Sequence, residues 1–184
     1  MINLEVTPID GVMILHSNPF RDSRGEFTRI FCDQDLNWVL QGKNVRQINR
    51  SITYNTGVVR GMHYQYAPHA ETKIVRCTAG KVFDVAVDLR IDSPTFLRWF
   101  GIELDSEKSD ALLLPEGCAH GFQTLLPNCQ MLYLHTSRFA KNAEGGVRFD
   151  DPKIGIKWPI TVTEVSQRDS DFPYLDKNFR GISA

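Results

Sequence analysis

The stretch VFDVAVDLR, residues Val82–Arg90, indicates the fold class because its side chains alternate with a period of two. Odd-numbered positions from Phe83 to Leu89 are apolar, and even-numbered positions from Asp84 to Arg90 carry all of its charges. This alternation is typical of a β-strand whose two faces meet different surroundings.

Similar apolar and β-branched runs lie on both sides of this stretch. We expect further strands at Gly11–Leu15, Lys73–Cys77, Phe96–Leu104, Ala111–Leu114, Gly121–Leu125 and Met131–Thr136. Turn residues such as Ser93-Pro94 and Pro127-Asn128 separate them. Helical patterns are few, at Asp33–Leu40 and Ser166–Asp171. Many short strands at this spacing predict an all-β sandwich or barrel.

Length and composition predict one globular domain over 1–184, with a short C-terminal tail at about 177–184. The chain is 42% hydrophobic and 23% charged, which excludes disordered, collagen-like and coiled-coil classes. Its 21 basic and 22 acidic residues give a net charge of -1, so we expect no nucleic-acid or membrane partner.

The cysteines and the N-terminus together predict a cytoplasmic protein. Cys32, Cys77, Cys118 and Cys129 are widely spaced and form no C-x-x-C pair, as expected for reduced core residues. The first residues carry acids and lack the basic and apolar regions of a signal peptide.

Two histidines stand beside glycines inside apolar strands, His63 in VVRGMHYQ and His120 in PEGCAHGF. A lone strand histidine is most often a hydrogen-bonded core residue. Here Arg60 and Lys73 are close in sequence to His63 and add cations near a titratable base. A regular strand would put Arg60 and His63 on opposite faces, but Gly61 permits a bulge that re-aims them.

Other chemistries find less support in the residues. Metal-binding cupins usually pair two ligands as H-x-H followed by Glu, whereas this chain has His63-Tyr64-Gln65, so we expect no metal. G-x-S-x-G, G-x-G-x-x-G and Walker motifs are absent, so we expect no cofactor. Metal-free proton transfer on an anionic substrate remains, with Arg24, Arg60 and Arg76 as candidate phosphate ligands.

Seven segments occur in one order and resemble a known family. They are FRDSRGEF (Phe20–Phe27), Gln47-x-Asn49-x-Ser51, VVRGMHYQ (Val58–Gln65), KIVRCTAGKVFDVAVDLRIDSPTF (Lys73–Phe96), LPEGCAHGF (Leu114–Phe122), LYLHT (Leu132–Thr136) and DPKIGIKWP (Asp151–Pro159). Over about residues 10–176 the chain resembles the dTDP-4-dehydrorhamnose 3,5-epimerase family. The resemblance implies a cupin or jelly-roll β-barrel with a few short helices.

The resemblance also implies the chemistry. The substrate would be a nucleoside-diphospho-4-keto-6-deoxyhexose, whose C4 ketone acidifies the protons on C3 and C5, so that these centres invert through an enolate without metal or cofactor. His63 would be the base and Asp169 its orienting carboxylate, while Tyr133 would return the proton and Lys73 would stabilise the enolate oxygen. Sugar and diphosphate would be held by Arg24, Gln47, Asn49, Arg60, His120 and Glu144. Asp84 either contacts the site or is an ordinary barrel carboxylate.

Two departures from the family pattern leave the substrate open. After RGxF the family usually has Glu where this chain has Arg29, so Arg29 is a candidate selectivity residue. After LYLHT the family commonly has two tyrosines, and here Phe139 is left to stack on the nucleotide base. Thymidine is the default and CDP an alternative, and C3, C5 or both could be inverted.

The resemblance further implies a homodimer that exchanges an N-terminal strand, and a role in deoxysugar or O-antigen and lipopolysaccharide biosynthesis. Two other functions stay open on the sequence. One is a cupin that binds sugar nucleotides but has lost catalysis, and the other is a metal-dependent cupin enzyme.

Overall fold

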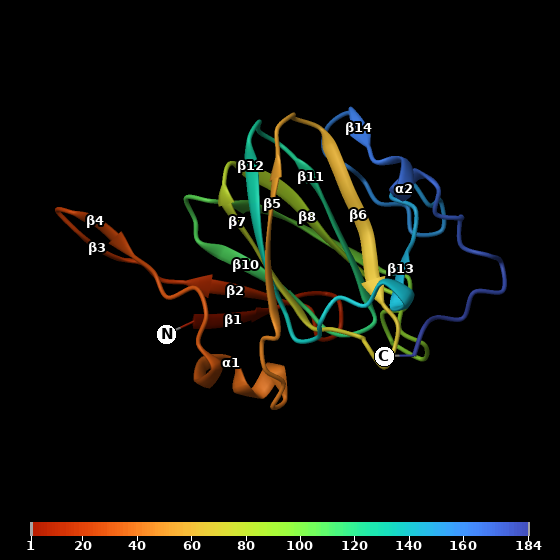
Figure 1. The fold of residues 1–184 in the computed structure, drawn as a ribbon, viewed down its shortest axis with the longest axis horizontal. Coiled ribbons are helices and arrows are strands. Elements are labelled where there is room, and N and C mark those ends of the chain that lie inside the picture. The colour runs from red at the N-terminus through yellow and green to blue at the C-terminus, as the bar shows by residue number, and fades with distance from the viewer. Residues whose placement is uncertain (1, 184) are drawn as a thin grey trace.

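The computed structural model describes residues 2–183 and is built mainly from two antiparallel sheets (Figure 1). The first has the order β1 (Ile2–Val6), β2 (Met13–Ser17), β10 (Asp110–Leu114), β7 (Lys73–Ala79), β12 (Cys129–His135) and β5 (Gln47–Thr53). The second has the order β13 (Glu144–Gly146), β6 (Val58–Gln65), β11 (Cys118–Thr124), β8 (Lys81–Asp88) and β9 (Trp99–Asp105), with β14 (Glu164–Val165) beside β6. This arrangement confirms the predicted all-β jelly roll.

The remaining elements lie outside the two sheets. β3 (Phe20–Asp22) and β4 (Gly25–Phe27) form a hairpin that projects away from the body of the molecule (Figure 1). The helices are α1 (Asp33–Leu40), α2 (Gln167–Ser170) and a 3₁₀ turn at Lys141–Ala143. Among residues 2–183, no helix has the length and hydropathy needed to cross a membrane.

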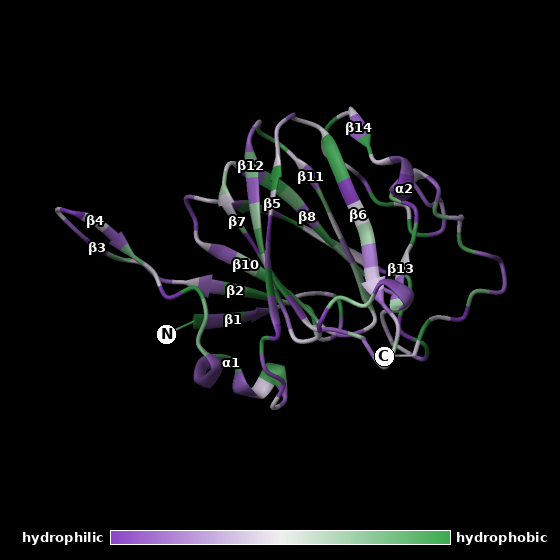
Figure 2. Cartoon of the chain, in the orientation of Figure 1, coloured by the Kyte–Doolittle hydropathy of each residue, from purple (hydrophilic) through white to green (hydrophobic). Residues whose placement is uncertain are grey.

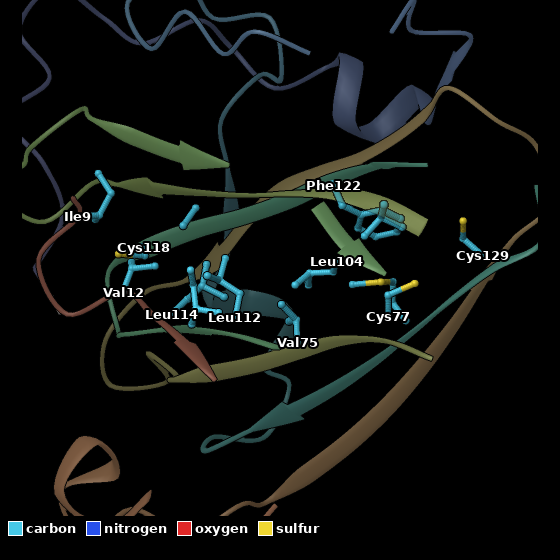
Figure 3. Close-up of a cluster of buried hydrophobic side chains, with 14 residues drawn as sticks. Ile9, Val12, Val75, Cys77, Leu104, Leu112, Leu114, Cys118, Phe122 and Cys129 are labelled. Carbon is cyan, nitrogen blue, oxygen red and sulfur yellow. The ribbon is translucent and has the colours of Figure 1, made fainter. Parts of the chain in front are cut away.

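The core has three layers. Side chains of both sheets interdigitate between them, among them Val75, Leu112 and Phe122 (Figure 3). The outer face of the first sheet is covered by α1, whose Leu36 and Leu40 are buried there. The outer face of the second sheet is covered by the irregular segment 147–182. The central strands of both sheets are therefore buried on both faces, so polar side chains within them need internal partners.

The stretch Val82–Arg90 forms most of β8 and shows the expected alternation. Val85 and Val87 pack on the outer face against the C-terminal segment, whereas Ala86 faces the layer between the sheets. Asp84 and Asp88 are fully buried on the same side as Ala86. The more polar face of β8 thus points into the barrel, where it can serve a site.

The N- and C-terminal segments pack within this chain. β1 pairs with β2 as the edge strand of the first sheet, from Ile2↔Ser17 to Val6↔Met13. In the expected tail, Ile182 is buried and its carbonyl accepts the Ile91 N–H at 3.0 Å. Exchange of an N-terminal strand between subunits, and the single domain over 1–184, stay predictions.

Candidate active site

A cavity of about 400 Å³ opens between the two sheets. β5, β7 and β12 of the first sheet and β6 and β11 of the second line it, and α2 closes it beside β6. Figure 2 shows that β6 begins with hydrophobic residues and then alternates between hydrophilic and less polar positions. The cavity is therefore a polar site inside an apolar scaffold, with one wall from each sheet.

The β6 wall depends on a bulge at Gly61. His63 pairs with His120 of β11 and Arg60 pairs with Phe122, so β6 carries one extra residue between these pairs. Gly61 has φ +127°, and a Cβ there would lie 2.5 Å from the Cα of Gly121. Only glycine fits such a position. The bulge brings both Arg60 and His63 to the cavity, as the sequence predicted.

His63 and Asp169 form the expected pair. The Asp169 carboxylate accepts the His63 Nε2–H at 2.8 Å and the Gly61 N–H at 3.1 Å. Burial alone would raise the pKa of Asp169, but the hydrogen bonds from His63 and Gly61 lower it below its ordinary value. The carboxylate therefore stays ionised and holds the proton on Nε2, which leaves Nδ1 of His63 as a free base.

Tyr133 lines the opposite wall, on β12 of the first sheet. Its hydroxyl lies 2.8 Å from the Ser51 Oγ. Burial raises the pKa of the Tyr133 phenol, against the smaller lowering effects of Ser51 and Arg60. Tyr133 therefore keeps its proton at neutral pH and can donate it.

Lys73 lies buried between these two walls. Its Nζ donates to the His63 carbonyl at 3.1 Å and lies 3.2 Å from Glu71 Oε1. An ammonium has three N–H donors. One donor therefore stays available to an oxygen of a bound substrate, as the prediction for Lys73 requires.

His120 has a carboxylate partner of its own. Its Nε2 lies 2.8 Å from Asp84 Oδ1, and Asp84 is fully buried. Burial raises the pKa of Asp84, and His120 acts in the opposite direction. The other oxygen, Oδ2, has no hydrogen-bond partner among the described residues. Asp84 thus orients His120 from behind and is not itself among the residues that line the cavity.

Most of the predicted binding residues also meet here. Arg60 donates to Thr53 Oγ1 at 2.9 Å, which turns its guanidinium toward β5. Gln47 lies at the rim, where its Oε1 accepts the Phe139 N–H at 3.0 Å. Residues of the predicted set that line the cavity are Asn49, Arg60, His63, Lys73, His120, Tyr133, Phe139, Glu144 and Asp169.

Three of the predicted arginines do not reach the cavity of their own chain. Arg24 lies in the β3–β4 hairpin, 86% exposed and paired with Asp22 at 2.6 Å. Arg29 precedes α1 and lies 3.7 Å from Asp35. Arg76 faces away from the cavity, buried near α1, where it donates to Ser17 Oγ at 3.0 Å and to the Ser109 carbonyl.

No group of three or more His, Cys, Asp or Glu side chains is placed to hold a metal ion within residues 2–183. His63 and His120 each contact one carboxylate through Nε2.

Comparison with known proteins shows the family of this chain. The profile of dTDP-4-dehydrorhamnose 3,5-epimerase matches residues 6–177. The chain belongs to this family. A relative of that name from Sinorhizobium fredii (strain NBRC 101917 / NGR234) is 39% identical over 165 residues, which are 89% of this chain and 85% of the relative.

Two solved structures of the family carry ligands. The dTDP-4-dehydrorhamnose 3,5-epimerase from Bacillus anthracis, with TDP and PPi bound, matches with a TM-score of 0.91 at 34% identity. The match covers 95% of this chain and 100% of that one. A dTDP-6-deoxy-D-glucose-3,5-epimerase from Legionella pneumophila, in complex with dTDP-4-keto-L-rhamnose, matches with a TM-score of 0.87 at 34% identity, covering 92% and 90%.

Glu71 and His135 are among the cavity-lining residues that sequence reasoning missed. A signal for each was available. His135 follows Tyr133 by two residues and Glu71 precedes Lys73 by two, so alternation along an extended chain puts each on the same face as a predicted site residue.

Proposed function

We propose that this chain is an isomerase that epimerises C3, C5 or both of a dTDP-4-keto-6-deoxyhexose. The observation that carries the proposal is the placement of a base and an acid on facing walls of one cavity. His63 comes from the second sheet and Tyr133 from the first. Inversion of a carbon centre requires removal of a proton from one face and its return to the other.

The groups of the cavity fit each step. Nδ1 of His63 takes the proton from C3 or C5, and Asp169 stabilises the imidazolium that forms. The electron pair of the broken C–H bond moves into an enolate, whose oxygen accepts an N–H from Lys73. Tyr133 then donates its phenolic proton to the opposite face of the carbon. No redox change occurs, because substrate and product are stereoisomers.

The other lining residues are proposed to bind the substrate. Arg60 and Asn49 are placed to bind phosphate oxygens, and Phe139 to stack on the base. Gln47 would contact the substrate at the rim of the cavity. His120 and Glu144 would contact the sugar. Thymidine is the base we propose, because the family profile and the bound ligands of the two solved relatives name dTDP or TDP.

We propose that the enzyme is a cytoplasmic homodimer of deoxysugar or O-antigen polysaccharide biosynthesis. Phe20 and Phe27 of the β3–β4 hairpin are 67% and 76% exposed, and β1 presents an unpaired sheet edge. Exposed apolar side chains on a projecting hairpin and the edge of a sheet are both features that a second subunit can cover. Arg24 does not reach the cavity of its own chain. In such a dimer the projecting hairpin would carry Arg24 to the substrate of the other subunit. A monomer by light scattering at micromolar concentration would contradict it.

The decisive experiment follows deuterium uptake from D2O into C3 and C5 of dTDP- and CDP-4-keto-6-deoxyglucose, with a chelator present. We expect uptake and new epimers with the dTDP substrate, and loss of both in His63→Asn. Binding without uptake would instead show an inactive sugar-nucleotide-binding cupin. Activity that the chelator abolishes and added metal restores would show a metal-dependent enzyme. Preference for the CDP substrate would overturn the assignment of thymidine.

A further inference from the structure

A buried chain of polar contacts links the reaction centre to the rim of the cavity. Glu71 binds Lys73 through Oε1 at 3.2 Å and His135 through Oε2 at 2.9 Å. On its other side, Nε2 of His135 lies 3.4 Å from the amide nitrogen of Asn49. The side chains of Glu71 and His135 are only 7% and 12% exposed. One carboxylate thus holds a catalytic lysine and a cavity-lining histidine together.

The backbone fixes this arrangement. His135 pairs with Lys73 across β12 and β7. Just beyond, the Thr136 N–H donates to the Thr72 carbonyl at 3.1 Å, and the Thr72 N–H donates to Thr136 Oγ1 at 2.9 Å. The segment that carries Glu71 is therefore held against the end of β12, so the contact between Glu71 and His135 is a built feature of the fold.

Hydrogen bonding also settles which nitrogen of His135 faces the cavity. Burial would raise the pKa of Glu71, but the bond from His135 and the charge of Lys73 lower it below its ordinary value. An ionised carboxylate only accepts, so Nδ1 of His135 carries a proton and Nε2 points toward Asn49. Protonation of Nε2 would give a cation whose counter-charge is already in place behind it.

The position of His135 matches one part of the substrate. Along β12 it lies one alternation beyond Tyr133, about 6–7 Å along the strand, and the two rings stack at 6.2 Å. Phe139 is 56% exposed, and its N–H donates to Gln47, which pairs with His135 across β5 and β12. With the hexose ring at Tyr133 and the base on Phe139, the diphosphate between them passes His135.

The charged groups around His135 come from both walls of the cavity. Glu71 and Lys73 face it from the β7 side, Tyr133 adjoins it on β12, and β5 contributes Asn49 and Arg50 to the lining. Across the cavity, Arg168 is ion-paired with Glu144 and Asp169 is bound to His63, whereas Arg60 forms no ion pair with the described acidic residues. A diphosphate carries at least two negative charges. Glu71 and Lys73 together are neutral, so a proton on His135 would add one net positive charge to this wall.

We propose that His135 is a substrate-binding residue that holds the diphosphate of the nucleotide sugar as an imidazolium, with Glu71 as the positioning residue behind it. The inference rests on the proposed function, because it takes a nucleoside-diphosphate sugar as the ligand. It predicts that substrate binding takes up a proton at His135, while the proton-transfer groups His63 and Tyr133 are unaffected.

The kinetic test compares His135→Gln, which cannot become a cation, with the wild type between pH 6 and 9. At low pH we expect the KM of the variant to be about 10–100-fold above that of the wild type, which is the contribution of one charge-assisted hydrogen bond. We expect kcat to stay within about threefold of the wild type. The wild-type KM should rise with pH toward the value of the variant. His135→Lys, a permanent cation, should keep a low KM with little pH dependence, and Glu71→Gln should move the rise in KM to lower pH. His69→Gln, an exposed histidine outside this cavity, is the matched control.

Calorimetry of dTDP binding separates this inference from the proposed function. Titrations in two buffers of different ionisation enthalpy give the protons taken up, and we expect less uptake in His135→Gln than in the wild type. If the enzyme turns over and His135→Gln changes neither KM nor proton uptake, the inference alone is refuted. It is also refuted if His135→Gln and His135→Lys raise KM equally at every pH. No turnover, but His135-dependent uptake on dTDP binding, would refute the proposed function alone. Neither turnover nor dTDP binding would refute both.

Discussion

Replacement of Asp169 by Asn tests the proposed base because it removes a charge and hardly changes shape. The carboxylate accepts two N–H groups, from His63 at 2.8 Å and from Gly61 at 3.1 Å. An amide has one acceptor oxygen and one NH2 group. If the NH2 faces Gly61, two donors meet in a buried place. If it faces His63, Nε2 must accept the hydrogen bond and the imidazole proton moves to Nδ1. A protonated Nδ1 cannot act as the base.

Both orientations have a measurable cost. A buried donor without an acceptor costs about 1–3 kcal/mol, so the first orientation lowers the free energy of unfolding by about that amount. The second leaves stability nearly intact and removes the active tautomer. In either orientation the imidazolium formed during the reaction loses its counter-charge. We therefore expect kcat to fall about 10²–10⁴-fold, the contribution of a positioned base.

The assay is deuterium exchange at C3 and C5 followed by NMR, with urea unfolding measured on the same protein. Asp171→Asn is the matched control, since Asp171 is an exposed carboxylate two residues away that accepts from Gln167 at 2.7 Å. It should leave both quantities unchanged. An Asp169→Asn enzyme with kcat within about threefold of the wild type would show that His63 does not depend on this carboxylate, and the assignment of the base would fall.

Three further perturbations follow from the same structure. Tyr133→Phe should keep deuterium exchange but lose most epimer formation, because His63 can return a proton only to the face it came from; equal loss of both would contradict the role of Tyr133 as acid. Gly61→Ala should lower the free energy of unfolding by about 2–6 kcal/mol, from its positive φ and the overlap of the new Cβ with β11, as measured in urea. Burial would raise the pKa of Asp88, but its hydrogen bonds, chiefly from Arg90, lower it below its unfolded value. Asp88 therefore stabilises the fold above about pH 4 and loses this effect as pH falls through its folded pKa. Asp88→Asn should cost about 3–5 kcal/mol at pH 7 and weaken the acid dependence; a variant as stable as the wild type at pH 7 would refute it.

Much of the fold could be predicted from the sequence because most strands carry apolar side chains. The helix expected at Asp33–Leu40 has the bounds of α1, and the run Lys73–Cys77 lies within β7. β5 was missed, since its sequence QINRSIT is largely exposed at a sheet edge and shows no apolar alternation. The β3–β4 hairpin was missed as well, since its strands have three exposed residues each and no core to pack against.

The site was less predictable than the fold. The bulge at Gly61 could be foreseen, because a glycine between Arg60 and His63 permits it. Most other roles came from resemblance and not from spacing. Alternation could have excluded Arg76, which is three residues from Lys73 and therefore on the opposite face of β7. The sequence nominates His63 and His120 but not His135. The carboxylate partners of the three lie 106, 36 and 64 residues away, and only the fold brings them together.

These three partners differ in a way that matches the roles we propose. Asp169 also binds the Gly61 N–H and Glu71 also binds Lys73, and the pKa of each is lowered. Asp84 has no second donor among the described residues, and burial raises its pKa. A full negative charge therefore stands behind His63, which takes a proton from carbon, and behind His135, which binds phosphate as a cation. Burial disfavours the charged form of Asp84, so the anion behind His120 is stabilised less than those behind His63 and His135, which suits His120 to a hydrogen bond with the sugar.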